Sequence, residues 1–324
     1  MIISRTPFRI SFTGGGTDLH EFYRHERGEV LTTAIDKYMY ITVNRRFDQS
    51  IRVSYSRTEI VPTVEAIDHP IVREALRLVG IKGGIEITSI ADVPAGTGLG
   101  SSSSFTVGLL HALYAYEGRY TSAEQLAQQA CDIEIRRLAT PIGKQDQYAA
   151  AYGGLQHLRF NPDDTVFVDP IICSDDTKHR LEQNLLLFYT GVSRPAEDIL
   201  TQQKQITAVK LDHLRQMRDL CEQAEKILTE GKDLHHFGTV LHQGWLLKRS
   251  LVHAISSSAI DRWYAQAVAA GAVGGKLLGA GGGGFLLFYV EPPKQAAVRE
   301  ALAELRELSF QFEPQGSKII YVGS

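Results

Sequence analysis

The chain has 324 residues, of which 44% are hydrophobic, and its formal net charge is −3. This length and composition predict a large buried core and about two domains, whereas the small net charge argues against a broad nucleic-acid or anionic-membrane surface. The three cysteines are widely spaced and form no CxxC pair, which argues against a disulfide framework or a structural zinc site.

The start of the chain, residues 1–7, turns polar at once and lacks the charged segment and apolar run of a signal peptide. No apolar run approaches the roughly 20 residues that span a bilayer. We therefore expect a soluble, cytoplasmic protein with no nucleic-acid or membrane partner. The sequence does not determine the oligomeric state, and a homodimer stays open.

The first half of the chain is predicted to begin with strands and to continue with helices. Alternating β-branched and aromatic residues predict strands over 1–12, 30–34, 38–46, 51–55, 59–61 and 85–90. Helical spacing of apolar residues predicts helices over 19–25, 71–79, 105–116, 122–138 and 144–151. A hairpin over 155–160 and 165–168 is expected to follow.

The second half is predicted to alternate helices and strands after a domain boundary near 173–180. A buried strand is expected over 185–189, and helices over 195–200, 209–229 and 234–254. The remaining elements are helix 259–270, strand 284–290, helix 293–305 and strand 318–322. This order predicts an α+β second domain.

One stretch, Asp92–Ser104, has the composition of an anion site. Gly96, Gly98 and Gly100 allow positive φ and a close approach of the backbone to a ligand. A helix that begins just after them offers unpaired N–H groups and a positive dipole end, so phosphate is the natural occupant. No lysine follows the last glycine, so this is not a Walker A loop. A Gly/Ser connector that merely caps the helix is the alternative.

Two further stretches, Pro7–Asp18 (PFRISFTGGGTD) and Lys276–Phe285 (KLLGAGGGGF), are also rich in glycine. Together with Asp92–Ser104 they resemble the three motifs of the GHMP kinases, the superfamily of galactokinase, homoserine kinase, mevalonate kinase and phosphomevalonate kinase. The resemblance spans nearly the whole chain. It implies an α+β fold of two domains, residues 1–175 like ribosomal protein S5 domain 2 and residues 176–324 ferredoxin-like, with ATP and Mg²⁺ bound between them.

The resemblance also implies roles for single residues. Ser102 and Glu134 align with the hydroxyl and the carboxylate that bind magnesium; a solvated helical face is the alternative for Glu134. Asp146, twelve residues later in a Gly-x-x-Asp-Gln context, aligns with the residue that accepts or orients the acceptor hydroxyl proton. An aspartate placed in a first helical turn by the dipole is compatible with that role. Arg9 is expected beside Asp146, where its guanidinium keeps that carboxylate ionised.

The residues implied for phosphate binding are Pro94, Gly96, Gly98, Leu99, Gly100, Ser101, Ser102 and Ser103. The residues implied for acceptor binding are Thr13, Gly15, Gly16, Asp18, Arg194, Gly281 and Gly282. Asp18 stands nine residues after Arg9, as the sugar-binding aspartate does in the galactokinase pattern. A carboxylate holds a sugar by accepting hydrogen bonds from its hydroxyl groups.

The acceptor itself is indicated by two segments, Gly14–Asp18 (GGGTD) and Tyr189–Arg194 (YTGVSR), which resemble the bacterial heptose 7-phosphate kinase branch. That branch phosphorylates the anomeric hydroxyl of D-glycero-D-manno-heptose 7-phosphate, and Arg194, Lys37 or Lys276 is the expected cation for the 7-phosphate. The glutamate-histidine segment of galactokinase is absent, which disfavours galactose. The alternatives are C1 phosphorylation of L-fucose, galactose or a uronic acid, and a ligand sensor without turnover.

Overall fold

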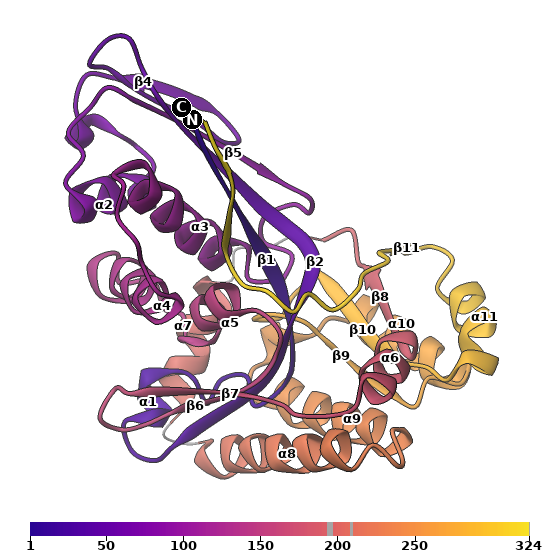
Figure 1. Cartoon of the computed structure of the whole chain (residues 1–324). Coiled ribbons are helices and arrows are strands. Elements are labelled where there is room, and N and C mark those ends of the chain that lie inside the picture. The colour runs from indigo at the N-terminus through magenta and orange to yellow at the C-terminus, as the bar shows by residue number, and fades with distance from the viewer. Residues whose placement is uncertain (193–196, 208–209, 324) are drawn as a thin grey trace.

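The computed structural model describes residues 1–192, 197–207 and 210–323. A long antiparallel pair of strands, β1 (Ile2–Thr13) and β2 (Gly28–Arg45), runs through the molecule (Figure 1). β2 is a single strand where the sequence predicts two. Pro7 pairs with Tyr38 but Phe8 pairs with Ile35, so residues 36 and 37 form a bulge that lets one strand continue through the charged break in the pattern.

The first sheet has eight strands, six of them in the order β12-β1-β2-β5-β3-β4, while β6 pairs with β2 and β7 with β6. Its remaining strands are β3 (Ile51–Ser54), β4 (Thr58–Val61), β5 (Ile85–Ala91), β6 (Leu155–Phe160), β7 (Val166–Pro170) and β12 (Lys318–Val322). Only β3 and β5 pair in parallel. The sequence predicts β12 but groups it with the second domain; in the structure it extends the first sheet along β1.

Helices cover one side of the first sheet (Figure 1). They are α2 (Pro70–Val79), α3 (Ser101–Tyr116), α4 (Ala123–Cys131) and α5 (Gln145–Tyr152), with the short α1 (His20–Tyr23) and a 3₁₀ turn (Val64–Ala66) in the connections. α3 is buried along most of its length and packs on β1 and β2. The Ser104 hydroxyl donates to Pro7 O at 2.9 Å, which fixes the start of α3 against the middle of β1.

The helix predicted over 122–138 changes its winding halfway. Ser122 caps α4 by accepting from the Gln125 N–H, but α4 ends at Cys131 and a π-helix follows over Asp132–Arg137. A π-turn admits one extra residue per turn and so rotates the side chains that follow it. With this change of winding, Glu134 is buried, with only 1% of its surface exposed, whereas a solvated helical face would have exposed it.

The second sheet has four antiparallel strands in the order β11-β8-β10-β9. They are β8 (Leu185–Tyr189), β9 (Gly274–Leu277), β10 (Phe285–Tyr289) and β11 (Arg306–Glu307). The helices of this half are α6 (Asp175–Gln183), α7 (Glu197–Ile206), α8 (Leu211–Glu230), α9 (His235–Arg249), α10 (Ser258–Ala269) and α11 (Pro292–Ala301), with a 3₁₀ turn at His253–Ile255.

One apolar core runs from the first sheet into the second half of the chain. Cys221 on α8 and Phe237 and Leu241 on α9 belong to the same buried cluster as the residues of β1, β2 and α3. A second cluster, around Trp245 and Phe288, fills the space between the second sheet and its helices. None of the helices described has the length and apolar composition needed to cross a bilayer.

Candidate active site

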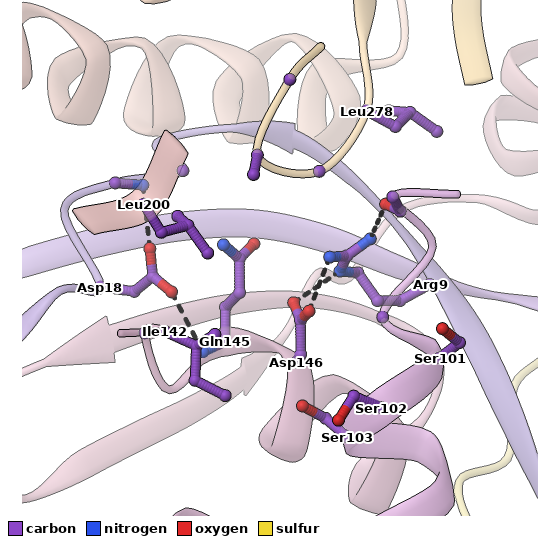
Figure 2. Close-up of a pocket in the computed structure, with 18 of the residues that line it drawn as sticks. Arg9, Asp18, Ser101, Ser102, Ser103, Ile142, Gln145, Asp146, Leu200 and Leu278 are labelled. Carbon is purple, nitrogen blue, oxygen red and sulfur yellow. Dashed lines mark hydrogen bonds and ion pairs between the residues drawn. The ribbon is translucent and has the colours of Figure 1, made fainter. Parts of the chain in front are cut away.

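The three glycine-rich segments meet around a cavity of about 500 Å³ (Figure 2). Its walls come from β1, from the loop before α3, from the start of α5, from α7 and α9, and from the loop between β9 and β10. Segments from both halves of the chain are therefore needed to form it.

The loop before α3 has the backbone that its glycines predict. Gly96, Gly98 and Gly100 have φ values of 72°, 84° and 77°, all in the left-handed region that favours glycine. Gly100 is the N-cap of α3, so the N–H groups of the first turn open towards the cavity that Ser101, Ser102 and Ser103 line. A helix N-terminus behind a glycine loop is suited to phosphate.

The loop between β9 and β10 supports this phosphate loop from the other half of the chain. A Cβ added to Gly98 would lie 2.5 Å from Leu278 O, and a Cβ added to Gly279 would lie 2.4 Å from the Gly98 Cα. The two backbones touch at a contact that only glycine fits. The position of the phosphate loop therefore depends on the C-terminal motif.

Arg9 and Asp146 form a bidentate ion pair on the floor of the cavity (Figure 2). Arg9 Nε donates to Asp146 Oδ1 at 2.7 Å and Nη2 donates to Oδ2 at 2.8 Å, while Nη1 donates to Gly98 O at 2.6 Å. Arg9 is only 3% exposed, whereas the Asp146 side chain is 24% exposed to the cavity. The guanidinium thus holds the carboxylate in one orientation beside the phosphate loop.

Asp18 lies in the same cavity, between the first glycine turn and the start of α5. Its Oδ1 accepts from the Gly16 N–H at 2.9 Å and its Oδ2 from the Gln145 N–H at 3.3 Å. Burial raises the pKa of Asp18 above its ordinary value, the nearby Asp146 charge adds to this rise, and the two backbone donors oppose it. Each carboxylate oxygen keeps a lone pair with which it can accept from a ligand hydroxyl.

Glu134 meets Ser102, which lines the cavity, but does not line the cavity itself. Ser102 Oγ donates to Glu134 Oε1 at 2.7 Å, and Gln147 Nε2 donates to Glu134 Oε2 at 2.8 Å. Burial raises the pKa of Glu134, and these two hydrogen bonds oppose the rise. A hydroxyl and a carboxylate at the head of a phosphate loop fit Mg²⁺, which prefers oxygen ligands and keeps several waters and substrate phosphates around it.

Gly15, Gly16 and Gly281 line the cavity as the sequence predicts, but besides Glu134 four other predicted residues of the described chain do not. The Thr13 hydroxyl donates to Cys221 Sγ in the core, and the Gly282 N–H donates to Ile255 O. These are corrections to the predicted acceptor set. Pro94 O accepts from the Thr97 hydroxyl and Leu99 is 1% exposed in the apolar core, so both shape the phosphate loop from behind.

Two of the three cations expected for a 7-phosphate, Lys37 and Lys276, do not line the cavity. Lys37 pairs with its neighbour Asp36 outside the cavity. Lys276 is buried, and its ammonium donates to Ser11 O and Phe12 O, so it joins β9 to β1 instead of facing the cavity. Arg194 lies outside the described residues.

Among the lining residues that were not predicted, three have long polar side chains: Gln145, Gln203 and Lys248. Lys248 carries a signal that the sequence analysis missed, because it continues the buried stripe of Phe237, Leu241 and Trp245 along α9, where a lysine is unusual. Gln145 is adjacent to the predicted Asp146. No pattern in the sequence marks Gln203, which reaches the cavity through the placement of α7.

Comparison with known proteins identifies the family. The family model for the N-terminal domain of GHMP kinases matches residues 65–154, and the model for their C-terminal domain matches residues 217–307. Together these matches cover more than half of the chain. They include the loop before α3, the Glu134 and Asp146 positions and the loop between β9 and β10.

Similar proteins match along almost the full length. The D-glycero-alpha-D-manno-heptose 7-phosphate kinase of Campylobacter jejuni is 29% identical over 98% of this chain and 98% of its own. The galactokinase of Pyrococcus furiosus is 26% identical over 96% of this chain and 94% of its own. The crystal structure of a D-glycero-D-manno-heptose 1-phosphate kinase from Bacteroides thetaiotaomicron shares the fold, with a TM-score of 0.83 over 100% of both chains at 24% identity. With its three glycine-rich segments closed around one cavity, this chain belongs to the GHMP kinases and is an ATP-dependent phosphotransferase.

Proposed function

We propose that the chain transfers the γ-phosphoryl group of ATP to the anomeric (C1) hydroxyl of D-glycero-D-manno-heptose 7-phosphate, giving the 1,7-bisphosphate for nucleotide-activated heptose. The observation that carries the transfer is the Arg9–Asp146 pair, placed between the phosphate loop and Asp18 in one cavity. The name of the Campylobacter jejuni relative supports the choice of acceptor.

The acceptor end of the cavity suits a polyhydroxylated ligand. Asp18 offers carboxylate lone pairs, and two buried amide atoms, Gln145 Oε1 and Gln203 Nε2, have no hydrogen-bond partner within the described part of the chain. Gln203 is only 6% exposed. A buried polar atom without a partner costs about 1–3 kcal/mol, which a sugar hydroxyl at either amide would relieve.

The chemistry then follows from the placement of Asp146. The acceptor hydroxyl donates to the free lone pair of Asp146, its oxygen forms the bond to the γ-phosphorus, and the proton passes to the carboxylate. The bond between the γ-phosphorus and the β–γ bridging oxygen breaks, and ADP leaves with that electron pair. Arg9 keeps Asp146 aimed at the reacting hydroxyl and holds Gly98 O of the phosphate loop in register.

Ser102 and Glu134 are the residues that would hold Mg²⁺, which when bound neutralises charge on the ATP phosphates. Gln147 keeps the Glu134 carboxylate turned towards Ser102 through its amide N–H. The N–H groups at the start of α3 bind phosphate oxygens without any bound metal, because they belong to the helix end itself.

The test is ADP formation with ATP and magnesium across a panel of heptose 7-phosphate, heptose, mannose, L-fucose and galactose, with phosphorus NMR of the product. We expect the highest kcat/KM with heptose 7-phosphate and a C1 phosphate in the product. Asp146→Asn should lose about 10²–10⁴-fold in kcat. Asp175→Asn, the same change at a fully exposed position, should lose nothing.

Two outcomes would contradict the proposal. Turnover confined to an unphosphorylated sugar would make the chain a C1 kinase of that sugar and remove the role of the 7-phosphate. ATP binding without ADP formation for any member of the panel would point to a ligand sensor, because a sensor needs binding and not transfer.

A further inference from the structure

Lys248 is a buried cation in the active-site cavity that the mechanism above does not use. It lies in the last turn of α9, is 7% exposed and lines the cavity. Its ammonium donates to the backbone oxygen of Gly279, and it makes no ion pair with any carboxylate of the described residues. A buried ammonium is costly unless it is paired, so its surroundings are completed by an anion.

The carboxylates near Lys248 already have other partners. Asp146 accepts from Nε and Nη2 of Arg9, and Asp18 accepts from two backbone N–H groups. Both carboxylates and Arg9 lie within electrostatic range of Lys248, yet burial dominates and lowers the pKa of Lys248 to about 8. The anion that suits this ammonium therefore belongs to a substrate.

The position of Lys248 indicates which anion. Gly279, which accepts from Lys248, touches Gly98 of the phosphate loop, and Gly98 O in turn accepts from Arg9. Arg9 on β1 and Lys248 on α9 thus bind neighbouring backbone oxygens on the two sides of the glycine contact. An oxygen of the terminal phosphate of ATP, lying over this loop and facing Asp146, would come between the two cations.

We infer that Lys248 is a catalytic residue that donates hydrogen bonds to the non-bridging oxygens of the phosphoryl group while it passes from ATP to the acceptor. This inference rests on the phosphoryl transfer proposed above and adds no covalent step to it. Lys248 stays protonated throughout, and its charge is drawn to the group in transfer. Two cations from opposite halves of the chain then hold that group in line between ADP and the acceptor hydroxyl.

The first test is steady-state kinetics of Lys248→Met and Lys248→Arg, with Arg249→Met as the matched control. Arg249 is the next residue of the same helix, but its side chain is 42% exposed and pairs with Asp261. We expect Lys248→Met to lower kcat about 10²–10³-fold, as the loss of one oxyanion donor does, with an unchanged KM for the acceptor. Lys248→Arg should recover part of kcat, and Arg249→Met should keep all of it.

The second test is calorimetric binding of ADP and of the β,γ-imido analogue of ATP, both with magnesium. Lys248→Met should weaken the analogue about 10- to 100-fold and leave ADP unchanged, because only the analogue carries the third phosphate. Thermal unfolding of each variant checks that the fold is intact. If Lys248→Met does not fold, Lys248→Gln keeps an N–H donor for Gly279 and serves in the same comparison.

Three results would overturn the inference. An unchanged kcat in Lys248→Met would remove the catalytic role. Equal weakening of ADP and the analogue would assign Lys248 to support of the loop. A loss confined to the KM for heptose 7-phosphate, with heptose unaffected, would assign the residue to the acceptor phosphate.

The binding test separates this inference from the proposed function, because it needs no acceptor. A wild-type enzyme that binds the analogue but phosphorylates no sugar in the panel would refute the proposed acceptor, and the contrast between the analogue and ADP would still decide the role of Lys248. Full turnover of heptose 7-phosphate by both wild type and Lys248→Met would refute the inference about Lys248 but not the proposed function.

Discussion

The contact between the two glycine loops yields the sharpest prediction, which is the effect of Gly98→Ala. A Cβ at this position would lie 2.5 Å from Leu278 O, 2.8 Å from the Leu278 carbonyl carbon and 3.2 Å from the Gly279 nitrogen. All three are backbone atoms, so no side chain can rotate away. The two loops must separate to admit the methyl group.

Three terms set the magnitude. Alanine at a left-handed φ of 84° costs about 1–2 kcal/mol, and overpacking a close contact costs about 1–3 kcal/mol. The lower entropy of the unfolded alanine chain returns about 0.4–1 kcal/mol. We therefore expect Gly98→Ala to lower the free energy of unfolding by about 1–5 kcal/mol. We expect kcat to fall about 100-fold if the phosphate loop moves by about 1 Å.

Gly80→Ala is the matched control, measured by urea unfolding and by ADP formation beside Gly98→Ala. Gly80 ends α2 with a φ of 91°, and a Cβ there would meet nothing within 4 Å. It shares the backbone strain and the entropy term but not the contact, so the two variants should differ by about 1–3 kcal/mol. Equal losses of stability, or a Gly98→Ala enzyme with full kcat, would refute the role assigned to the contact.

Three other predictions concern the charged groups of the cavity. Arg9→Met should lower the free energy of unfolding by about 2–4 kcal/mol, because it leaves the partly buried Asp146 carboxylate without its cation. In urea unfolding, the double variant Arg9→Met/Asp146→Asn should recover part of that loss. Additive losses in the double variant would contradict the pairing. Glu134→Gln should raise the magnesium concentration for half-maximal ADP formation at least about tenfold. Because burial raises the pKa of Glu134, the magnesium concentration that the wild type needs should also rise as the pH falls. An unchanged magnesium requirement in Glu134→Gln would remove Glu134 from the metal site. Burial, with a smaller contribution from the Arg9 charge, lowers the pKa of Lys248 to about 8 against the opposing charges of Asp18 and Asp146, so the ammonium is lost as the pH rises. ATP affinity, measured by calorimetry, should therefore fall about tenfold from pH 7 to 9 in wild type but not in Lys248→Arg. Equal slopes would argue against Lys248 as the titrating group.

The sequence predicts the parts of the site that depend on local chemistry. Gly96 and Gly98 have the positive φ values that their place before a helix predicts. Most helices and strands lie within a few residues of their predicted ranges. The family motifs also bring Arg9 and Asp146 to the same place, although 137 positions of the chain separate them.

What the sequence does not reveal depends on tertiary packing. The switch from α-helix to π-helix at Asp132 leaves no trace in composition, since it is decided by the hydrogen bonds that Glu134 makes with Ser102 and Gln147. The failure of Thr13 as an acceptor residue has the same origin, because the core position of Cys221 on α8 draws its hydroxyl away from the cavity. Periodicity shows Lys248 on a buried stripe but not what it faces.

The pairing of β12 with β1 has a consequence for synthesis on the ribosome. β1 is synthesised long before its outer neighbour β12, which lies about 300 residues further along the chain. Until then the central ribbon of the first sheet has an open edge, and Lys276 has not yet reached Ser11 and Phe12. Unpaired edges recruit other strands, so the nascent chain is a natural client for chaperones. Folding of the first sheet therefore waits for residues 318–322, and no kinase activity is expected from a nascent chain that has not yet reached them.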